Sequence, residues 1–187
     1  MPLQARSKNT VNTILSVSRQ ILLNDGVLKF STNTIAKKSG LSVGSIYQYF
    51  QSKEKILDAL LEIELSSSIR KLEENLDKLT NQSVEEKING LLSNISNMFS
   101  ENEYLLQALN IFSKCESFNI DLFFENEILT RAKEFFSFDE SSSLSKEIEN
   151  LLLLTKHTLM PCAATPNSNA IYLLNSVARN IVQTNTP

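Results

Sequence analysis

The chain has 187 residues, of which 42% are hydrophobic and 21% are charged, close to the averages for soluble globular proteins. This composition excludes collagen-like, mucin-like and wholly disordered chains. Only four glycines and four prolines occur, and no proline lies between Pro2 and Pro161. A β-sandwich or β-barrel needs many more turns than these residues supply. The sequence therefore predicts an all-α fold.

Cysteine usage and hydropathy indicate the compartment. The two cysteines, Cys115 and Cys162, are too few for a disulfide framework and form no Cys-x-x-Cys pair. Residues 1–13 are polar and lack the apolar core of a signal peptide. No unbroken apolar run approaches the roughly 20 residues that span a membrane. We therefore expect a soluble, cytoplasmic protein that makes no membrane contact.

Charge is distributed unevenly along the chain. Residues 1–55 hold eight Lys and Arg against two Asp and Glu, a net charge of +6, whereas the whole chain carries −3. A compact basic segment in an acidic protein is the electrostatic signature of a phosphate-binding module. A solvated basic face without a partner produces the same pattern. Charge alone leaves both interpretations open.

The basic segment is predicted to contain three helices. Apolar residues recur at helical spacing over 11–22, and Gly26 is expected to cap this first helix in the left-handed conformation. A second helix is expected after Ser31 or Thr32, and a third after Ser42. Two short helices with a tight glycine-containing turn, braced by a longer helix, form the outline of a helix-turn-helix.

The third predicted helix has two different faces. Ile46 and Phe50 are four residues apart and are predicted to be buried together, with small or hydrogen-bonding uncharged residues opposite. Gly44 costs about 1 kcal/mol relative to alanine inside a helix. A bare backbone there suits a position that another molecule approaches closely, such as the floor of a DNA groove. Lys53, at the start of the next predicted helix, is placed to bind a phosphate.

Residues 35–57 resemble the DNA-binding signature of the tetracycline-repressor (TetR) family. The resemblance rests on the run Gly-Ser-Ile-Tyr-Gln-Tyr-Phe-Gln-Ser-Lys-Glu at 44–54, with Ile-Ala at 35–36 and a glycine at 40 upstream. It implies a recognition helix at about residues 43–49. The candidate DNA-contacting residues are Thr32, Asn33, Val43, Gly44, Ser45, Tyr47, Gln48, Tyr49 and Lys53.

The resemblance also implies roles for these residues. Ser45 and Gln48 would face bases, and Lys53 would bind the DNA backbone. Tyr47 and Tyr49 match positions that contact phosphates or thymine methyl groups, although packing of the Tyr47 ring against the first helix is an alternative. The threonine and asparagine at 32–33 match positions that contact a phosphate or a base, whereas the valine at 43 offers no hydrogen bond to a base.

The remainder of the chain is predicted to be helical as well. The resemblance implies a DNA-binding domain at residues 1–52 and a larger ligand-binding and dimerisation domain at 53–187. No glycine or proline occurs from Lys53 to Thr80, so one long helix is expected there. A capping box at Ser83–Glu86 is predicted to open the next helix. Further helices are expected at about 102–114 and 118–136, followed by a serine-rich loop at 138–143.

Eight of the ten phenylalanines lie between Phe99 and Phe138. Rings at this density either fill a core or line a cavity for an apolar ligand, and the resemblance implies a small-molecule pocket in this region. Acidic residues interleave with the rings, so a lipophilic cation is a further option. The candidate ligand-binding residues are Phe99, Tyr104, Phe112, Phe118, Phe123 and Phe124.

The last two predicted helices, at about 144–159 and 170–181, are rich in apolar residues. The first is apolar on most of its circumference, so it must be buried on more than one side. The resemblance implies a homodimer in which these helices form a four-helix bundle. The candidate interface residues are Leu151, Leu152, Leu159, Leu174, Val177 and Ile181.

No pattern typical of a cofactor, metal or catalytic site occurs. The only histidine, His157, belongs to no Glu-x-x-His motif, and no phosphate loop, nucleophile elbow or zinc spacing is present. We therefore expect no cofactor and no enzymatic activity. The sequence predicts a homodimeric repressor that a small hydrophobic ligand releases from a palindromic operator. A helical protein-interaction module with a basic head is the alternative, and a helical-bundle enzyme comes third.

Overall fold

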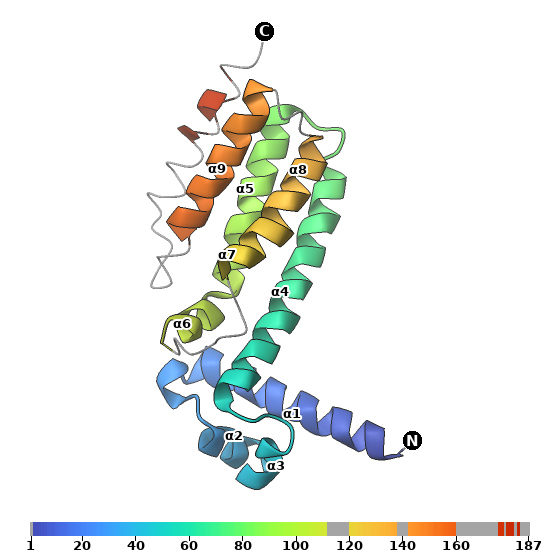
Figure 1. Ribbon diagram of the computed structural model, residues 1–187, viewed down its shortest axis with the longest axis vertical. Coiled ribbons are helices and arrows are strands. Elements are labelled where there is room, and N and C mark those ends of the chain that lie inside the picture. Colours follow the sequence, from blue (N-terminus) through green and yellow to red (C-terminus); the bar gives the residue numbers. More distant parts are fainter. Residues whose placement is uncertain are drawn as a thin grey trace. The chain divides into compact units, whose positions relative to one another are not determined.

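The computed structural model describes residues 2–111, 120–137 and 142–159, together with 176, 177, 179–181 and 183. Within these ranges every regular element is a helix, as the composition predicts (Figure 1). None of the helices in these ranges is long and apolar enough to cross a membrane. Phe112, Phe118, Cys115, Cys162, Leu174 and most of the predicted last helix lie outside the described residues.

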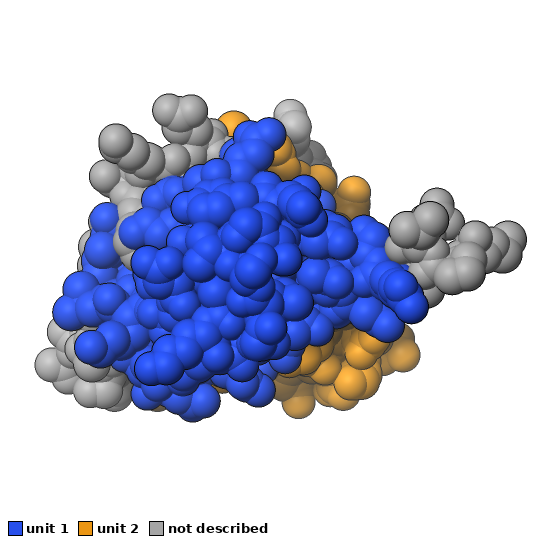
Figure 2. All heavy atoms as spheres, turned by 90° about the horizontal axis from the view of Figure 1, so that it is seen from below, with its two compact units in different colours: residues 1–64, 102–118 blue, residues 65–101, 119–187 orange. Residues whose placement is uncertain are grey.

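The chain divides into two compact units (Figure 2). Unit 1 contains residues 1–64 and 102–118, and unit 2 contains residues 65–101 and 119–187. This division differs from the boundary expected at residue 52, because residues 53–64 and 102–118 belong to the first unit. The functional division into a DNA-binding and a ligand-binding domain stays a prediction.

Unit 1 contains the predicted helix-turn-helix. It comprises α1 (Pro2–Asn24), the 3-10 helix η1 (Val27–Lys29), α2 (Thr32–Ser39), α3 (Val43–Tyr47) and α6 (Glu103–Ile111), with the first turns of α4. Helix α2 packs against both α1 and α3, and α6 packs against α1 and η1. The core of this unit includes Ile14, Ile21, Phe30, Ile35 and Ile46.

Local hydrogen bonds set the ends of these helices. Ser31, and not Thr32, caps α2, since its hydroxyl accepts a hydrogen bond from the backbone N–H of Thr34 at 3.1 Å. Gly26 has a positive φ of 80°, but its ψ of 166° is extended, so the expected left-handed cap is wrong. The backbone N–H of Asp25 already donates to the Ile21 carbonyl, and Gly26 instead turns the chain into η1.

Unit 2 is a packed group of helices around an apolar core. The long predicted helix is confirmed as α4 (Lys53–Lys78), which begins in unit 1 and ends in unit 2. The other elements are α5 (Val84–Glu101), α7 (Ile120–Phe123), the π-helix η2 (Phe124–Leu129), α8 (Thr130–Phe136) and α9 (Ser143–Leu159). Helix α9 packs against α5 and η2. The expected helix over 118–136 is therefore helical throughout its described part, with a π-helical middle.

The predicted capping box at the start of α5 is confirmed. The Ser83 hydroxyl oxygen accepts a hydrogen bond from the backbone N–H of Glu86 at 3.3 Å. The Glu86 carboxylate in turn accepts from the backbone N–H of Ser83 at 2.9 Å and from its hydroxyl at 2.8 Å. These two hydrogen bonds, the hydroxyl first, lower the pKa of Glu86 below its ordinary value of 4.5.

We expect Ser83→Ala to lower the free energy of unfolding by about 1 kcal/mol, because the first turn of α5 loses its cap. The lowered pKa of Glu86 stabilises the folded protein above the unfolded pKa, and this stabilisation is lost as the pH falls through the folded pKa. The difference between the wild type and Ser83→Ala should therefore shrink from about pH 5 to pH 3 in urea unfolding. A constant difference over this range would contradict the assigned role of Glu86.

Candidate DNA-binding and ligand-binding sites

The short helix α3 begins with a capped turn, and its second residue, Gly44, has space for a side chain. The Ser42 hydroxyl oxygen accepts from the backbone N–H of Ser45 at 2.9 Å, and the two hydroxyls are hydrogen-bonded at 2.8 Å. A Cβ placed on Gly44 would meet only the Ser42 Oγ, at 3.8 Å, which is ordinary contact. Packing within the described part of the chain therefore does not require glycine at this position.

The polar residues after Gly44 lie on the surface. Tyr47 is 51% exposed and Tyr49 is 37% exposed, and Gln48 between them is also exposed. Half of Tyr47 is thus accessible to another molecule even where its ring contacts the protein. Ile46 is fully buried, whereas Phe50 is half-buried and not fully buried as predicted. Ile46 therefore anchors α3. The recognition helix expected at about residues 43–49 ends at Tyr47, so the accessible Gln48 and Tyr49 lie just beyond α3.

The basic residues of unit 1 include some that are paired with acids and others that are exposed. Three of the eight bases in residues 1–55 are paired with carboxylates, which reduces the positive charge available to a partner. These pairs are Arg19 with Glu64 at 2.8 Å, Lys55 with Asp58 at 3.2 Å, and Lys38 with Asp25. Four other bases are exposed, namely Arg6, Lys8, Lys29 and Lys37.

The other candidate DNA contacts lie at helix starts. Lys53 is the first residue of α4 and is partly exposed. Ser52 caps this helix, since its hydroxyl accepts a hydrogen bond from the backbone N–H of Lys55 at 3.3 Å, and that amide therefore already has a partner. Thr32 is partly exposed and Asn33 is exposed in the first turn of α2. All nine candidate residues thus belong to unit 1, and their contacts with DNA stay predictions.

The candidate ligand-binding residues are divided between the two units. Phe99, Phe123 and Phe124 belong to unit 2, where Phe124 has no exposed surface, Phe99 is buried and Phe123 is half-buried. Tyr104 belongs to unit 1, and the remaining two candidates lie outside the described residues. The structure therefore places three of the six candidates in one unit, and their role in ligand binding stays a prediction.

Tyr104, a candidate ligand-binding residue, has charged neighbours. It lies on α6 beside Arg19 of α1 and Glu64 of α4, which form an ion pair with each other. Burial raises the pKa of the Tyr104 hydroxyl, and the carboxylate of Glu64 raises it further, while Arg19 acts in the opposite direction. Residues so far apart in the chain gave no signal of this grouping in the sequence.

A buried lysine lies next to the aromatic residues of unit 2. Lys156 on α9 is 7% exposed, and its Nζ lies 5.9 Å from the centroid of the Phe124 ring and 3.6 Å from the Glu125 carboxylate. A second acid of this region, Glu127, is paired with Arg131 at 2.7 Å. The lysine beside Phe124 is thus already paired with an acid, and the lipophilic cation considered from the sequence stays a prediction.

The candidate interface residues that are described lie mostly inside the chain's own core. Leu151 and Leu152 on α9 are each 1% exposed in the single chain, whereas Leu154 is half-exposed. Ile181 is buried and Val177 is half-buried. The side chain of Leu159 lies outside the described residues, as does that of His157. Dimerisation through these residues stays a prediction. Among the described residues, no group of three or more His, Cys, Asp or Glu is arranged to hold a metal ion.

Comparison with known proteins identifies the N-terminal segment. Residues 14–60 match the family described as bacterial regulatory proteins, tetR family. Over 63 residues the chain is 30% identical to the fatty acid metabolism regulator protein of Bacillus subtilis (strain 168). The aligned region covers 34% of this chain and 32% of that relative, so it spans about a third of the relative's length.

Two solved structures resemble the chain over most of its length. The transcriptional regulator FadR from Bacillus subtilis, in complex with stearoyl-CoA, has a TM-score of 0.57 and 21% identity and covers 91% of this chain and 96% of its own. The fatty acid degradation regulator FadR from Bacillus halodurans has a TM-score of 0.57 and 17% identity, with 91% and 97% covered. At these identities the likeness shows the fold, and it confirms the predicted all-helical architecture.

We expect Gly44→Ala to separate the stability of α3 from its contact with DNA. Because a Cβ at this position makes only an ordinary van der Waals contact, the variant should unfold at the same or a higher urea concentration, with a gain of up to about 1 kcal/mol. The added methyl group should weaken specific duplex binding by about tenfold, because it occupies the space that DNA would fill. Ser42→Ala is the contrasting variant, since loss of the cap should destabilise the protein by about 1 kcal/mol.

The Gly44→Ala variant is tested by two measurements, which together show whether DNA approaches this position. Fluorescence anisotropy measures the duplex affinity, and urea unfolding measures the stability. A stable Gly44→Ala protein that binds DNA as well as the wild type would show that the backbone at this position does not approach the duplex.

Proposed function

We propose that this chain, which belongs to the tetR family of bacterial regulatory proteins, is a cytoplasmic transcriptional repressor without catalytic activity. It would bind a palindromic operator as a homodimer and leave it when a hydrophobic ligand binds. In this proposal residues 1–52 bind DNA, and residues 53–187 bind the ligand and form the dimer. The observation that carries it is the surface at α3, where Gly44, which packing does not require to be glycine, is followed by the half-buried Ser45 and the exposed Tyr47 and Gln48.

The chemistry of this face suits the reading of bases. Ser45 and Gln48 offer hydrogen bonds without charge, and such groups read base edges in the major groove. The hydrogen bond between Ser42 and Ser45 holds the Ser45 hydroxyl in place, so less side-chain entropy is lost when it meets a base. A dimer presents two such helices, and B-DNA requires them to be about 34–36 Å apart.

The charges of unit 1 suit the phosphates on either side of the groove. The exposed bases and Lys53 would neutralise phosphates and release counterions, so affinity should fall as the salt concentration rises. The paired bases Arg19 and Lys38 contribute less, because a carboxylate already balances each of them. The expected salt dependence is therefore smaller than the count of eight bases suggests.

We expect binding to a duplex selected from a random pool to weaken with salt, with a slope of about −0.9 per neutralised phosphate. Lys53→Ala should reduce the magnitude of this slope by about one unit and weaken all sequences alike. Lys78→Ala is the matched control, because Lys78 lies at the other end of the same helix and in unit 2. Affinity that does not depend on salt, or a pool that yields no duplex, would refute the proposed function.

The ligand that we propose is a long-chain acyl thioester. The solved FadR from Bacillus subtilis holds stearoyl-CoA, and this chain shares its fold. Unit 2 supplies the buried rings of Phe99 and Phe124 for an apolar chain and the cation of Lys156 for an acidic group. This combination suits an amphipathic anion better than a neutral aromatic compound.

We expect stearoyl-CoA to lower the affinity for the selected duplex, and coenzyme A without the acyl chain to leave it unchanged. By linkage, a tenfold loss of DNA affinity requires a tenfold weaker affinity of stearoyl-CoA for the DNA complex. Phe123→Ala should reduce the response, whereas Phe136→Ala, another half-buried phenylalanine of unit 2, should not. Anisotropy titrations measure both effects, and equal release by coenzyme A alone would exclude recognition of the acyl chain.

A further inference from the structure

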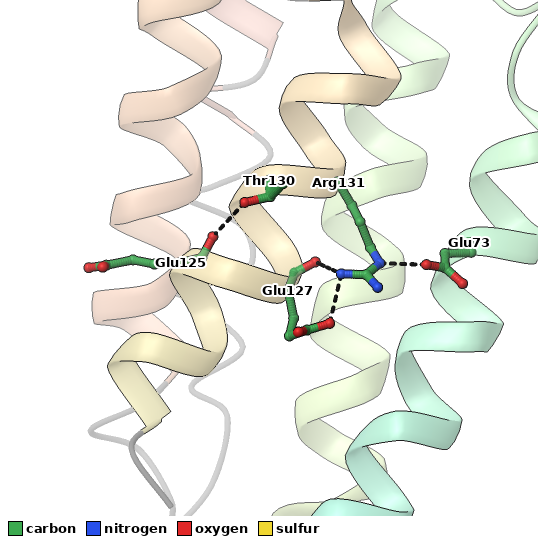
Figure 3. A network of polar contacts seen from close by, with 5 residues as sticks. All are labelled: Glu73, Glu125, Glu127, Thr130 and Arg131. Atoms are coloured by element: carbon green, nitrogen blue, oxygen red, sulfur yellow. Dashed lines mark hydrogen bonds and ion pairs between the residues drawn. The ribbon is translucent and has the colours of Figure 1, made fainter.

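The helical stretch from Ile120 to Phe136 contains a π-helical segment, η2, between two α-helical segments. The residues on either side have ordinary α-helical angles, with φ −59° and ψ −47° at Phe123 and φ −61° and ψ −47° at Thr130. The backbone N–H of Thr130 donates to the Glu125 carbonyl, five residues earlier. The Thr130 hydroxyl donates to the same carbonyl at 3.1 Å (Figure 3), so two donors of one residue hold this turn.

In a π-helical turn the hydrogen bond joins residues five apart and not four apart, so the turn contains one residue more than an α-helical turn. Such turns are rare and occur frequently at functional sites. Each α-helical residue turns the chain by about 100° and advances it by about 1.5 Å. Relaxation of η2 to α geometry would therefore rotate and shift α8 by these amounts relative to α7. The two geometries are discrete registers and not a continuous range, and this structure shows the π-helical one.

Arg131 connects this segment to α4. Its Nη1 donates to the carbonyl of Glu127 at 2.9 Å and to the Glu127 carboxylate at 2.7 Å. Its Nε donates to the carboxylate of Glu73 on α4 at 2.6 Å. Figure 3 shows the guanidinium lying between these two acids. A rotation of about 100° would move Arg131 away from Glu73, so the pair between α8 and α4 exists in one register only.

The apolar side of the same segment lies in the core of unit 2. Phe124 and Ile128 in η2 have no exposed surface, and η2, which lies between α7 and α8 in one helical stretch, packs against α9. Phe124 and Ile128 fill this part of the core, so a ligand that takes their place would displace these side chains. Displacement of Phe124 and Ile128 moves the backbone of η2, and the second register is the discrete arrangement open to it.

We propose that η2 is a register switch through which the ligand acts on α4. In the register of this structure, the Arg131–Glu73 ion pair holds α4 in the arrangement that binds DNA. In the other register this pair is broken and DNA affinity falls. The inference rests on the proposed repressor function, because it specifies how the ligand would be coupled to the operator.

The test compares one substitution in two backgrounds. Glu73→Gln should weaken binding to the selected operator duplex by about two- to fivefold, as expected for a partly exposed ion pair. Asn126 is an exposed residue of η2. Its deletion removes the extra residue of the π turn, so the whole stretch becomes α-helical. The orientation of α7 and α8 is preserved. In the deletion background Glu73→Gln should have no effect, because the segment has no second register. The deletion variant should also stay on the operator in the presence of stearoyl-CoA that releases the wild type.

Control variants separate the switch from a general loss of helix packing. Lys133→Met breaks the ion pair of α8 with Glu149 on α9, at 3.0 Å, and should leave operator affinity unchanged in both backgrounds. Thr130→Val loses the hydroxyl that holds the π turn and should weaken binding as Glu73→Gln does, whereas Thr130→Ser should match the wild type. The two Thr130 variants, Thr130→Val and Thr130→Ser, test the proposal even if the deletion variant does not fold.

The possible failures can be told apart. An equal effect of Glu73→Gln in both backgrounds, or no effect in the chain that retains Asn126, overturns the register switch. Thr130→Val with wild-type affinity also overturns it. A wild-type protein that binds no duplex overturns the proposed function itself.

Discussion

The DNA-reading face that we propose depends on the burial of one side chain, Ile46. Helix α3 has only five residues, and a helix of this length is not stable by itself in water. Its stability comes from Ile46, which is fully buried in unit 1, and from the hydroxyl of Ser42 at its first turn. Because one residue anchors the helix, its neighbours Ser45, Tyr47 and Gln48 do not have to pack and can serve contact with another molecule.

The charged residues of the chain also divide into those that are paired within the chain and those that are exposed. In unit 1 acids balance some of the bases, such as Arg19 by Glu64, while other bases remain exposed over the surface. In unit 2 the acids near the aromatic residues are engaged by Arg131 and Lys156. Lys156 is buried beside Phe124, and the Glu125 carboxylate compensates its charge.

Helix α4 gives the two units a common element. It begins at Lys53, among the candidate DNA contacts, and in unit 2 its Glu73 is held by Arg131. An effect on Arg131 therefore acts on the same helix that carries Lys53. The π-helical segment before Arg131 is the part of unit 2 with a second discrete arrangement, and bistable elements of this kind are what small changes at a site can bias.

Features decided by neighbours in the chain could be predicted from the sequence. The caps at Ser42 and Ser83 and the amphipathic pattern of the first helix depend on residues three or four positions apart, so the spacing alone indicates them. The helix-turn-helix and its exposed polar face could be predicted for the same reason. The conformation of Gly26 could not, because it depends on where the last hydrogen bond of α1 forms.

Features decided by residues far apart in the chain required the tertiary structure. The contact of Tyr104 with Arg19 and Glu64, and the burial of Lys156, arise from the packing of separate helices, which hydrophobic spacing does not encode. The sequence predicts one helix over 118–136 and gives no sign of the π turn at η2, which the structure shows. The sequence thus determined the helices and the chemistry of α3. Tertiary packing decided which charges are buried, which are paired and which helix Arg131 holds, because those energies depend on neighbours brought together from distant positions.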